Sequence, residues 1–98
     1  MKVERLLGAS TNIVGPYQTV DDWQDITIQI ASSANKPFKG TVTIEGTLDI
    51  DQETILWSVL LESVTEAVLK LSGYALAGVR ATTSRVTGGE VVVLVSGH

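Results

Sequence analysis

Apolar and polar residues alternate in two segments of the first half of the chain. Residues 26–30 alternate strictly between isoleucine and a polar residue, and residues 40–49 alternate in the same way. Because successive side chains of a strand point to opposite faces, both segments are predicted to be strands with one face in the core. In the second segment the predicted core face holds Val42, Ile44 and Leu48, and the outer face holds Thr41, Thr43, Glu45 and Thr47. Gly46 interrupts the core face and indicates a bulge or a close neighbour.

The end of the chain contains two more segments with the composition of strands. Residues 78–86 and 90–96 are joined by a turn, Thr87-Gly88-Gly89. The later segment is apolar on both faces, since alternate positions place Val91, Val93 and Val95 on one side and Val92 and Leu94 on the other. A small β domain has one core, so we expect one of these faces to contact another chain. The alternative is that residues 1–8 cover the second face as an arm.

Residues 51–72 fit two different patterns. As a helix, the segment has Asp51 as its N-cap, Gly73 as its C-terminal cap and one apolar stripe, formed by Leu56, Leu60, Val64, Ala67, Val68 and Leu71. As strands, the first part places Ile55, Trp57, Val59 and Leu61 on one face, and residues 68–71 follow a turn near Glu62. The strand pattern accounts better for Trp57, and periodicity alone leaves both alternatives open.

The complete pattern predicts an all-β protein. A chain of 98 residues is expected to be a single domain. Six or seven short strands at this spacing are typical of an antiparallel β-sandwich or a jelly-roll-like fold. A short helix within residues 51–72 is the one alternative element. Residues 3–7 are a short candidate strand, and residues 1–25 are otherwise expected to form an N-terminal arm or loop region.

Composition narrows the classes of function. Hydrophobic residues make up 44% of the chain and charged residues 18%, which in so small a domain favours assembly, and a homo-oligomer is expected. The net charge of −4 argues against nucleic acid as a partner. Since no apolar run is long enough for a signal peptide or a membrane span, we expect neither secretion nor a membrane partner. The chain has no cysteine, which excludes disulfides and thiol chemistry.

No group of residues fits a catalytic or metal site. His98 is the only histidine, and it stands at the end of the chain without a second group to orient it as a general base. The serines and threonines lack a paired base. Asp49, Asp51 and Glu53 could offer oxygen ligands to Ca²⁺, but the EF-hand spacing is missing, so a solvated acidic turn is expected. We therefore expect no enzymatic activity, no metal and no cofactor.

Aromatic and arginine side chains are the best candidates for contacts with a partner. Four aromatic residues lie in or beside predicted loops, where a ring can complete the core, anchor a protein interface or stack on a sugar. Two arginines lie on one predicted strand an odd number of residues apart, hence on opposite faces. Trp57 is expected in the core. Val92 and Leu94, on the second face of the last strand, complete the set. The candidate interface residues are therefore Tyr17, Trp23, Phe38, Tyr74, Arg80, Arg85, Val92 and Leu94.

Several short motifs follow one another in the later part of the chain. They are Gly46-Thr47-Leu48-Asp49, Trp57-Ser58-Val59-Leu60, Val79-Arg80-Ala81, Thr83-Ser84, and Thr87-Gly88-Gly89-Glu90-Val91-Val92-Val93. In this order they resemble a small β-sandwich found in structural proteins of tailed bacteriophages. One departure is the turn after Asp49, which is usually glycine-rich and here reads Ile50-Asp51-Gln52-Glu53-Thr54. The resemblance implies a sandwich that builds virions as capsid decoration, head fibre or tail accessory, without an activity of its own.

The sequence therefore predicts a non-enzymatic virion structural protein, assembled in the host cytoplasm. Its expected role is that of a capsid decoration or cement protein, which binds the major capsid lattice through apolar strand faces and loop aromatics. One alternative is a receptor- or glycan-binding module of a head or tail fibre, which predicts an exposed ring at Trp23 or Tyr74. The other is a neck or tail connector subunit, which predicts closed rings of higher order.

Overall fold

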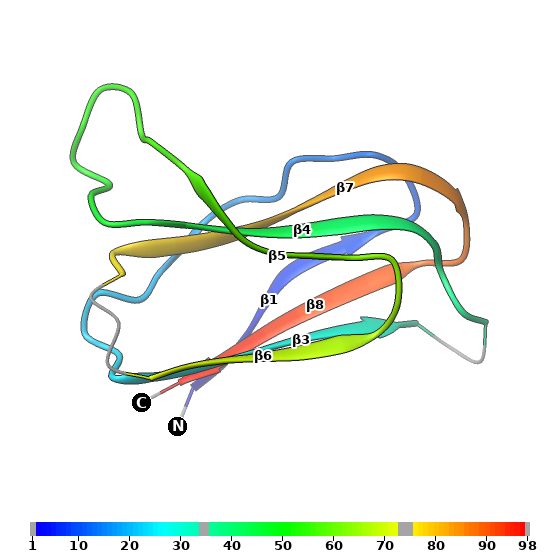
Figure 1. The fold of residues 1–98 in the computed structure, drawn as a ribbon, viewed down its shortest axis with the longest axis horizontal. Helices are drawn as coiled ribbons and strands as arrows, with labels where there is room; N and C mark the ends of the chain where they lie inside the picture. Colours follow the sequence, from blue (N-terminus) through cyan, green and yellow to red (C-terminus); the bar gives the residue numbers. More distant parts are fainter. Residues whose placement is uncertain (1, 34–35, 73–75, 98) are drawn as a thin grey trace.

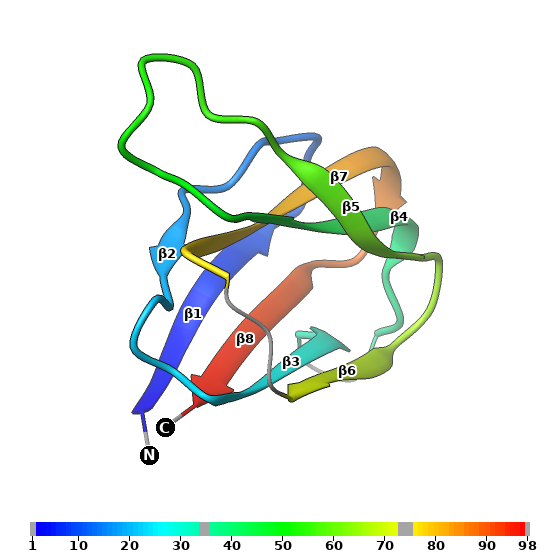
Figure 2. The ribbon, with the colours of Figure 1, turned by 60° about the vertical axis from the view of Figure 1, so that its left-hand side comes forward.

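Two antiparallel sheets make up the part of the protein that the structure, a computed structural model, describes, namely residues 2–33, 36–72 and 76–97 (Figure 1). The strands are β1 (Lys2–Ala9), β2 (Gln18–Thr19), β3 (Asp25–Ser32), β4 (Lys39–Thr47), β5 (Ser58–Ser63), β6 (Ala67–Ser72), β7 (Gly78–Gly88) and β8 (Val91–Gly97). The first sheet has the order β1-β8-β3-β6 and the second the order β2-β7-β4-β5. The all-β prediction is confirmed, and the two layers in Figure 2 are those of a β-sandwich.

The core lies between the two sheets and is formed by the inward-facing positions of their central strands. The isoleucines of β3 and alternate valines of β8 come from the first sheet, and apolar residues of β4 and β7 come from the second. The largest fully buried side chains are Val20, Ile26, Ile28, Ile30, Val42, Ile44, Val79, Val91, Val93 and Val95. The alternation predicted for residues 26–30 and 91–95 is thus confirmed, with Val91, Val93 and Val95 on the core side.

Most strands that follow each other in the sequence lie in different sheets. Among the described elements, β4 and β5 are the one consecutive pair that forms a hairpin. The glycine turn after β7 carries the chain from the second sheet to the first, so β7 and β8 are not neighbours. At this turn Gly89 has a φ of 73°, and a Cβ there would lie 2.6 Å from the Cα of Phe38. Only glycine fits so tight a crossing.

The helical alternative for residues 51–72 is wrong, because this segment forms a loop and two strands. Residues 48–57 form the loop, which projects beyond the second sheet (Figure 1), and β5 and β6 follow. The prediction that Val59 and Leu61 share a face is also wrong. Leu61 lies opposite Ile44 and packs on the core, whereas Val59 lies opposite Glu45 and is 60% exposed. The register shifts between these two pairs, and such a bulge reverses the faces of the residues that follow.

The end of β4 also differs from the alternating pattern. Thr47 was predicted to face outward and Leu48 inward, but Thr47 is buried and Leu48 is 74% exposed. The Thr47 hydroxyl donates a hydrogen bond to the carbonyl oxygen of Asp49 and accepts one from the Asp49 N–H. The Thr47 carbonyl accepts a further bond from the N–H of Ala77. These bonds end the strand one residue before Leu48, so the period of two no longer applies there.

The N-terminal segment forms an edge strand of the first sheet. β1 pairs with β8 along its whole length, with one irregularity between Arg5 and Leu7. Leu6 and Leu7 are both buried in the core, which the bulge makes possible. The alternative in which this segment covers the second face of β8 is therefore not found, because the segment lies beside β8 in the same sheet.

Candidate interaction surfaces

The outer face of the first sheet is partly apolar. Val92 and Leu94 are half-buried there, with Ala31 and Gln29 of β3 as their cross-strand neighbours. Val3 of β1 and Val68 of β6 are 60% and 59% exposed. We call the set Val3, Val68, Val92 and Leu94 the apolar face. Its aliphatic side chains are separated by Thr27, Gln29 and Ser96, and Arg5 and Lys70 lie opposite Leu94 and Thr27 on the same face, a mixed surface of the kind that protein interfaces use.

The outer face of the second sheet carries a cluster of aromatic and charged side chains. The Arg80 guanidinium carbon lies 4.4 Å from the ring centroid of Trp57, and the Tyr17 ring lies 6.0 Å from Trp57 at an angle of 47°. Arg80 also donates a hydrogen bond from Nε to Oε1 of Glu45 at 3.1 Å. We call Tyr17, Glu45, Trp57 and Arg80 the Trp57 cluster.

The strand register brings the members of the Trp57 cluster together. Glu45 and Arg80 lie directly opposite each other on β4 and β7, on the outward side. Gln18 pairs with Val79, so the preceding Tyr17 comes next to Arg80. Trp57 directly precedes β5 and reaches the same face. The Arg80 guanidinium is oriented from two sides, by the Glu45 carboxylate and by the Trp57 ring. A cation–π contact of this kind contributes about 0.5–1 kcal/mol to stability at a partly exposed site.

Trp57, like Leu48, was wrongly predicted to lie in the core. Its side chain is half-buried on the outer face, while the core positions nearby are filled by Leu60 and Leu61. The aromatic–arginine contact joins a residue of the loop before β5 to a residue of β7, far apart in the chain. No local pattern around residue 57 could therefore have indicated it.

The remaining candidate interface residues lie in different places. Trp23 and Phe38 are 7% and 6% exposed and belong to the core, which was one of the interpretations open to a loop aromatic. The exposed Trp23 ring that a glycan-binding module predicts is thus not found. Tyr74 lies outside the described residues. Arg85 is exposed and has a φ of 57°, beside the irregular pairing of β7 with β4, so strict alternation cannot assign it a face.

The acidic residues after β4 form a hydrogen-bonded turn. Oδ1 of Asp49 accepts a bond from the N–H of Asp51 at 2.8 Å, and Oδ2 accepts one from Nε2 of Gln52 at 3.2 Å. Within the part of the chain that the structure describes, no three acidic, histidine or cysteine residues come together as a metal site. His98 lies outside that part. No helix in the described ranges is long and apolar enough to cross a membrane.

Comparison with known proteins gives a likeness at the level of structure. No protein family model matches the chain, and no curated protein matches it either. The fold is similar to the crystal structure of the SPBc2 prophage-derived protein YomS, with a TM-score of 0.70 and 13% sequence identity. The superposition covers 96% of this chain and 89% of that one. At this identity the likeness shows a shared fold over nearly the whole length of both proteins.

Proposed function

We propose that this chain is a non-enzymatic structural protein of a bacteriophage or prophage that acts by binding other virion proteins. The observation that carries the proposal is the likeness to a prophage-derived protein, because it extends over nearly the whole of both chains. The order of motifs from Gly46 to Val93, which resembles structural proteins of tailed phages, supports the same role.

The finer form of the proposal is a capsid decoration protein that binds the major capsid lattice as a homo-oligomer. The apolar face supports this form, since Val3 and Val68 leave aliphatic surface open to water on a sheet whose other face is already in the core. The Trp57 cluster offers a second contact, because tryptophan, tyrosine and arginine are the residues enriched where interfaces are strongest. Burial of both surfaces would stabilise a shell by mass action.

The test is co-sedimentation of the purified protein with empty shells of the phage whose genome encodes it, combined with light scattering of the free protein. A defined small oligomer that sediments with the shells and raises their melting temperature supports decoration. A monomer that ignores the shells contradicts it, and a large closed ring favours a neck or tail connector instead.

Two matched variants locate the contact. Val68→Asp changes the apolar face, and Val64→Asp changes a 65% exposed valine between β5 and β6. Both positions are open to water, so neither variant should unfold the protein. We expect Val68→Asp to weaken shell binding at least about tenfold and Val64→Asp to leave it unchanged. Equal effects of the two variants would remove the apolar face from the proposal.

A second candidate function, binding of a cell-surface glycan, is favoured by one observation. Tyr17 is 46% exposed and lies beside Trp57 on one face, and such rings can stack on a sugar. Binding of an oligosaccharide that disappears in Trp57→Ala, with unchanged shell binding, would support this function over decoration.

A further inference from the structure

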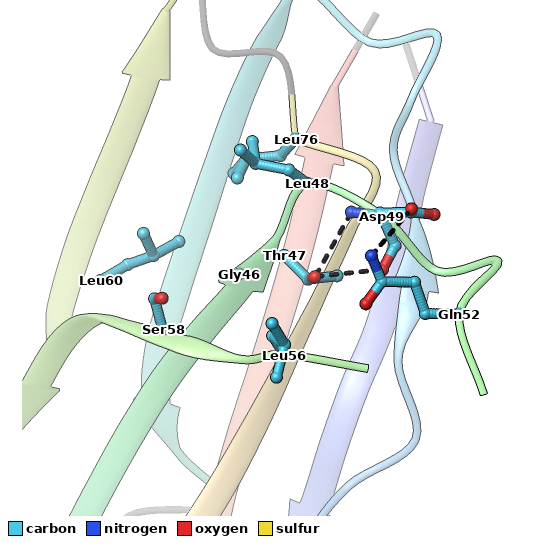
Figure 3. A pocket seen from close by; sticks show the side chains of 9 residues that line it. All are labelled: Gly46, Thr47, Leu48, Asp49, Gln52, Leu56, Ser58, Leu60 and Leu76. Carbon is cyan, nitrogen blue, oxygen red and sulfur yellow. Dashed lines mark hydrogen bonds between the residues drawn. The ribbon is translucent and has the colours of Figure 1, made fainter. Parts of the chain in front are cut away.

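A pocket opens between the loop of residues 48–57 and the two strand ends that this loop joins, the end of β4 and the start of β5. It has a volume of about 380 Å³. Figure 3 shows Leu48 and Leu76 at one end, Leu56 at the other and Leu60 at the side. The polar lining consists of Thr47, Asp49, Gln52 and Ser58. The volume is at the lower end of the range of about 300–1,000 Å³ for ligand pockets, so it fits a small apolar group.

Gly46 forms part of this lining, which explains its place in the sequence. A Cβ at residue 46 would lie 2.9 Å from Cδ1 of Leu60 and 3.2 Å from Cδ2 of Leu76. Any larger residue would push these two leucines into the open volume. The glycine was predicted to mark a bulge or a close neighbour. The close neighbours are found at Gly46, and the bulge lies just before it, where the register shifts between Ile44 and Glu45.

The loop that forms the outer wall is held in place by its own hydrogen bonds. Thr47 bonds to the backbone of Asp49 in both directions, and the Asp49 carboxylate accepts a bond from Gln52 (Figure 3). The same carboxylate also accepts a bond from the N–H of Asp51. The Ile50 side chain reaches the backbone of Gly78 at the start of β7, where a Cβ would lie 3.1 Å from its Cγ2. A wall fixed in this way does not have to be ordered when a ligand binds, which reduces the entropic cost of binding.

The loop that forms the outer wall exposes apolar side chains to water and carries negative charge. Leu48 and Leu56 are 74% and 71% exposed, although both line the pocket. The loop also holds Asp49, Asp51 and Glu53 and contains no basic residue. The Arg80–Glu45 ion pair, which is the salt bridge found among the described residues, involves none of these three carboxylates. Of the three, Asp49 lines the pocket, and Asp51 and Glu53 follow in the same loop. The negative charge of this wall therefore favours a cation next to an aliphatic group.

The pocket also lies beside a free sheet edge. β5 is an outer strand of the second sheet and pairs with β4 alone within the described part of the chain. Its other edge offers backbone N–H and C=O groups to an extended segment. A compact small molecule would contact the leucines but would not bond to this strand edge, whereas an extended peptide segment could do both.

From these observations we infer that the pocket receives an aliphatic side chain from an extended segment of a partner protein, with a basic side chain next to it. The four leucines would take the aliphatic group, and the carboxylates of residues 49–53 would take the cation. The inference rests on the proposed function for the origin of the partner, and its test uses isolated peptides.

The test is a titration of the isotope-labelled protein followed by nuclear magnetic resonance of backbone amides and leucine methyl groups. The probe is the peptide acetyl-Gly-Lys-Leu-Lys-Gly-amide, with the Glu-Leu-Glu and Lys-Ser-Lys peptides as controls. We expect the Lys-Leu-Lys peptide to shift signals of residues 46–60 and Leu76 with a Kd on the order of 1 mM, and each control to bind at least about tenfold more weakly. Binding should weaken when salt rises from about 0.05 to about 0.5 M, because screening acts on the charge contact.

Two variants keep the test decisive. Leu48→Ser and Leu56→Ser change exposed side chains that line the pocket, and Val64→Ser is the matched control at an exposed position elsewhere. We expect the first two to abolish the peptide shifts and the third to preserve them. The inference is overturned if no peptide causes shifts, if the Glu-Leu-Glu peptide binds equally well, or if the shifts fall on the apolar face. Leucine methyl shifts that depend on protein concentration alone would instead assign the pocket to a second copy of this chain.

The outcome for the pocket is separable from the outcome for the proposed function. Peptide binding in a protein that ignores phage shells supports the pocket and contradicts the decoration role. Shell binding that survives Leu48→Ser and Leu56→Ser, together with no peptide binding, overturns the pocket alone.

Discussion

Residues 91–95 and residues 55–61 are both rich in consecutive apolar residues, yet the fold uses them in opposite ways. In β8 three valines are fully buried, and the strand has hydrogen-bonded neighbours on both sides. In the other segment Leu56 and Val59 are 71% and 60% exposed, and β5 pairs with β4 alone among the described strands. A run of apolar residues therefore does not by itself indicate burial. At an edge strand it leaves a surface that a partner can cover.

The largest difference between the two regions should appear on loss of a core side chain. Ile28→Ala removes a fully buried side chain of β3 next to β8 and should lower the free energy of unfolding by about 2–5 kcal/mol. Leu56→Ala removes a mostly exposed side chain and should change it by less than about 0.5 kcal/mol. Urea denaturation of both variants measures the difference. Similar losses would mean that residues 48–57 are part of the core.

The turn that leads into β8 should be the next most sensitive position. Gly89→Ala places a Cβ against Phe38 at a positive φ and should cost about 1–3 kcal/mol of unfolding free energy. The adjacent Gly88→Ala is the control, since a Cβ there would meet only Cδ of Lys39 at 3.9 Å. Thermal unfolding separates the two, and a tolerated Gly89→Ala would contradict the tight crossing between the sheets.

A smaller effect is expected for the contact that joins the start of β5 to β7. A double-mutant cycle with Arg80→Met and Trp57→Leu should give a coupling energy of about 0.5–1 kcal/mol. The parallel cycle with Arg85→Met should give none, since the exposed Arg85 has no such contact with Trp57. Equal coupling in both cycles would show that the Trp57 cluster contributes nothing specific to the fold.

The smallest effect is expected on the outer side of β5. Val59→Thr keeps the branched shape at an exposed position and should change the unfolding free energy by less than about 0.5 kcal/mol. Val93→Thr places the same hydroxyl in the core and should cost about 1–3 kcal/mol, because the buried oxygen lacks a partner. Chemical denaturation of the pair checks this contrast, which fails if Val59→Thr is the more harmful change.

Regular alternation made the central strands predictable from sequence, whereas irregular elements escaped it. Residues 26–30 alternate with the period of two, residues 91–95 are apolar on both faces, and both form strands in which alternate side chains enter the core. Leu61 was placed on the same face as Val59, because the sequence does not reveal the bulge between them. Leu48 was placed in the core, because the sequence does not reveal that β4 ends just before it. The pocket could not be predicted, since its leucines come from β5, from the loop before it and from the segment before β7.

The sequence by itself determined the strand at residues 26–30 and a last strand that is apolar on two sides, whereas it left residues 51–72 open between a helix and strands. Local physics is sufficient there, because the direction of a side chain in a strand depends only on its position in the alternation. The tertiary structure alone decided which strands are neighbours, that β7 and β8 lie in different sheets, and that Trp57 meets Arg80 on the surface. These features depend on how sheets pair and pack over the whole chain, and residues far apart in sequence supply both sides of each contact.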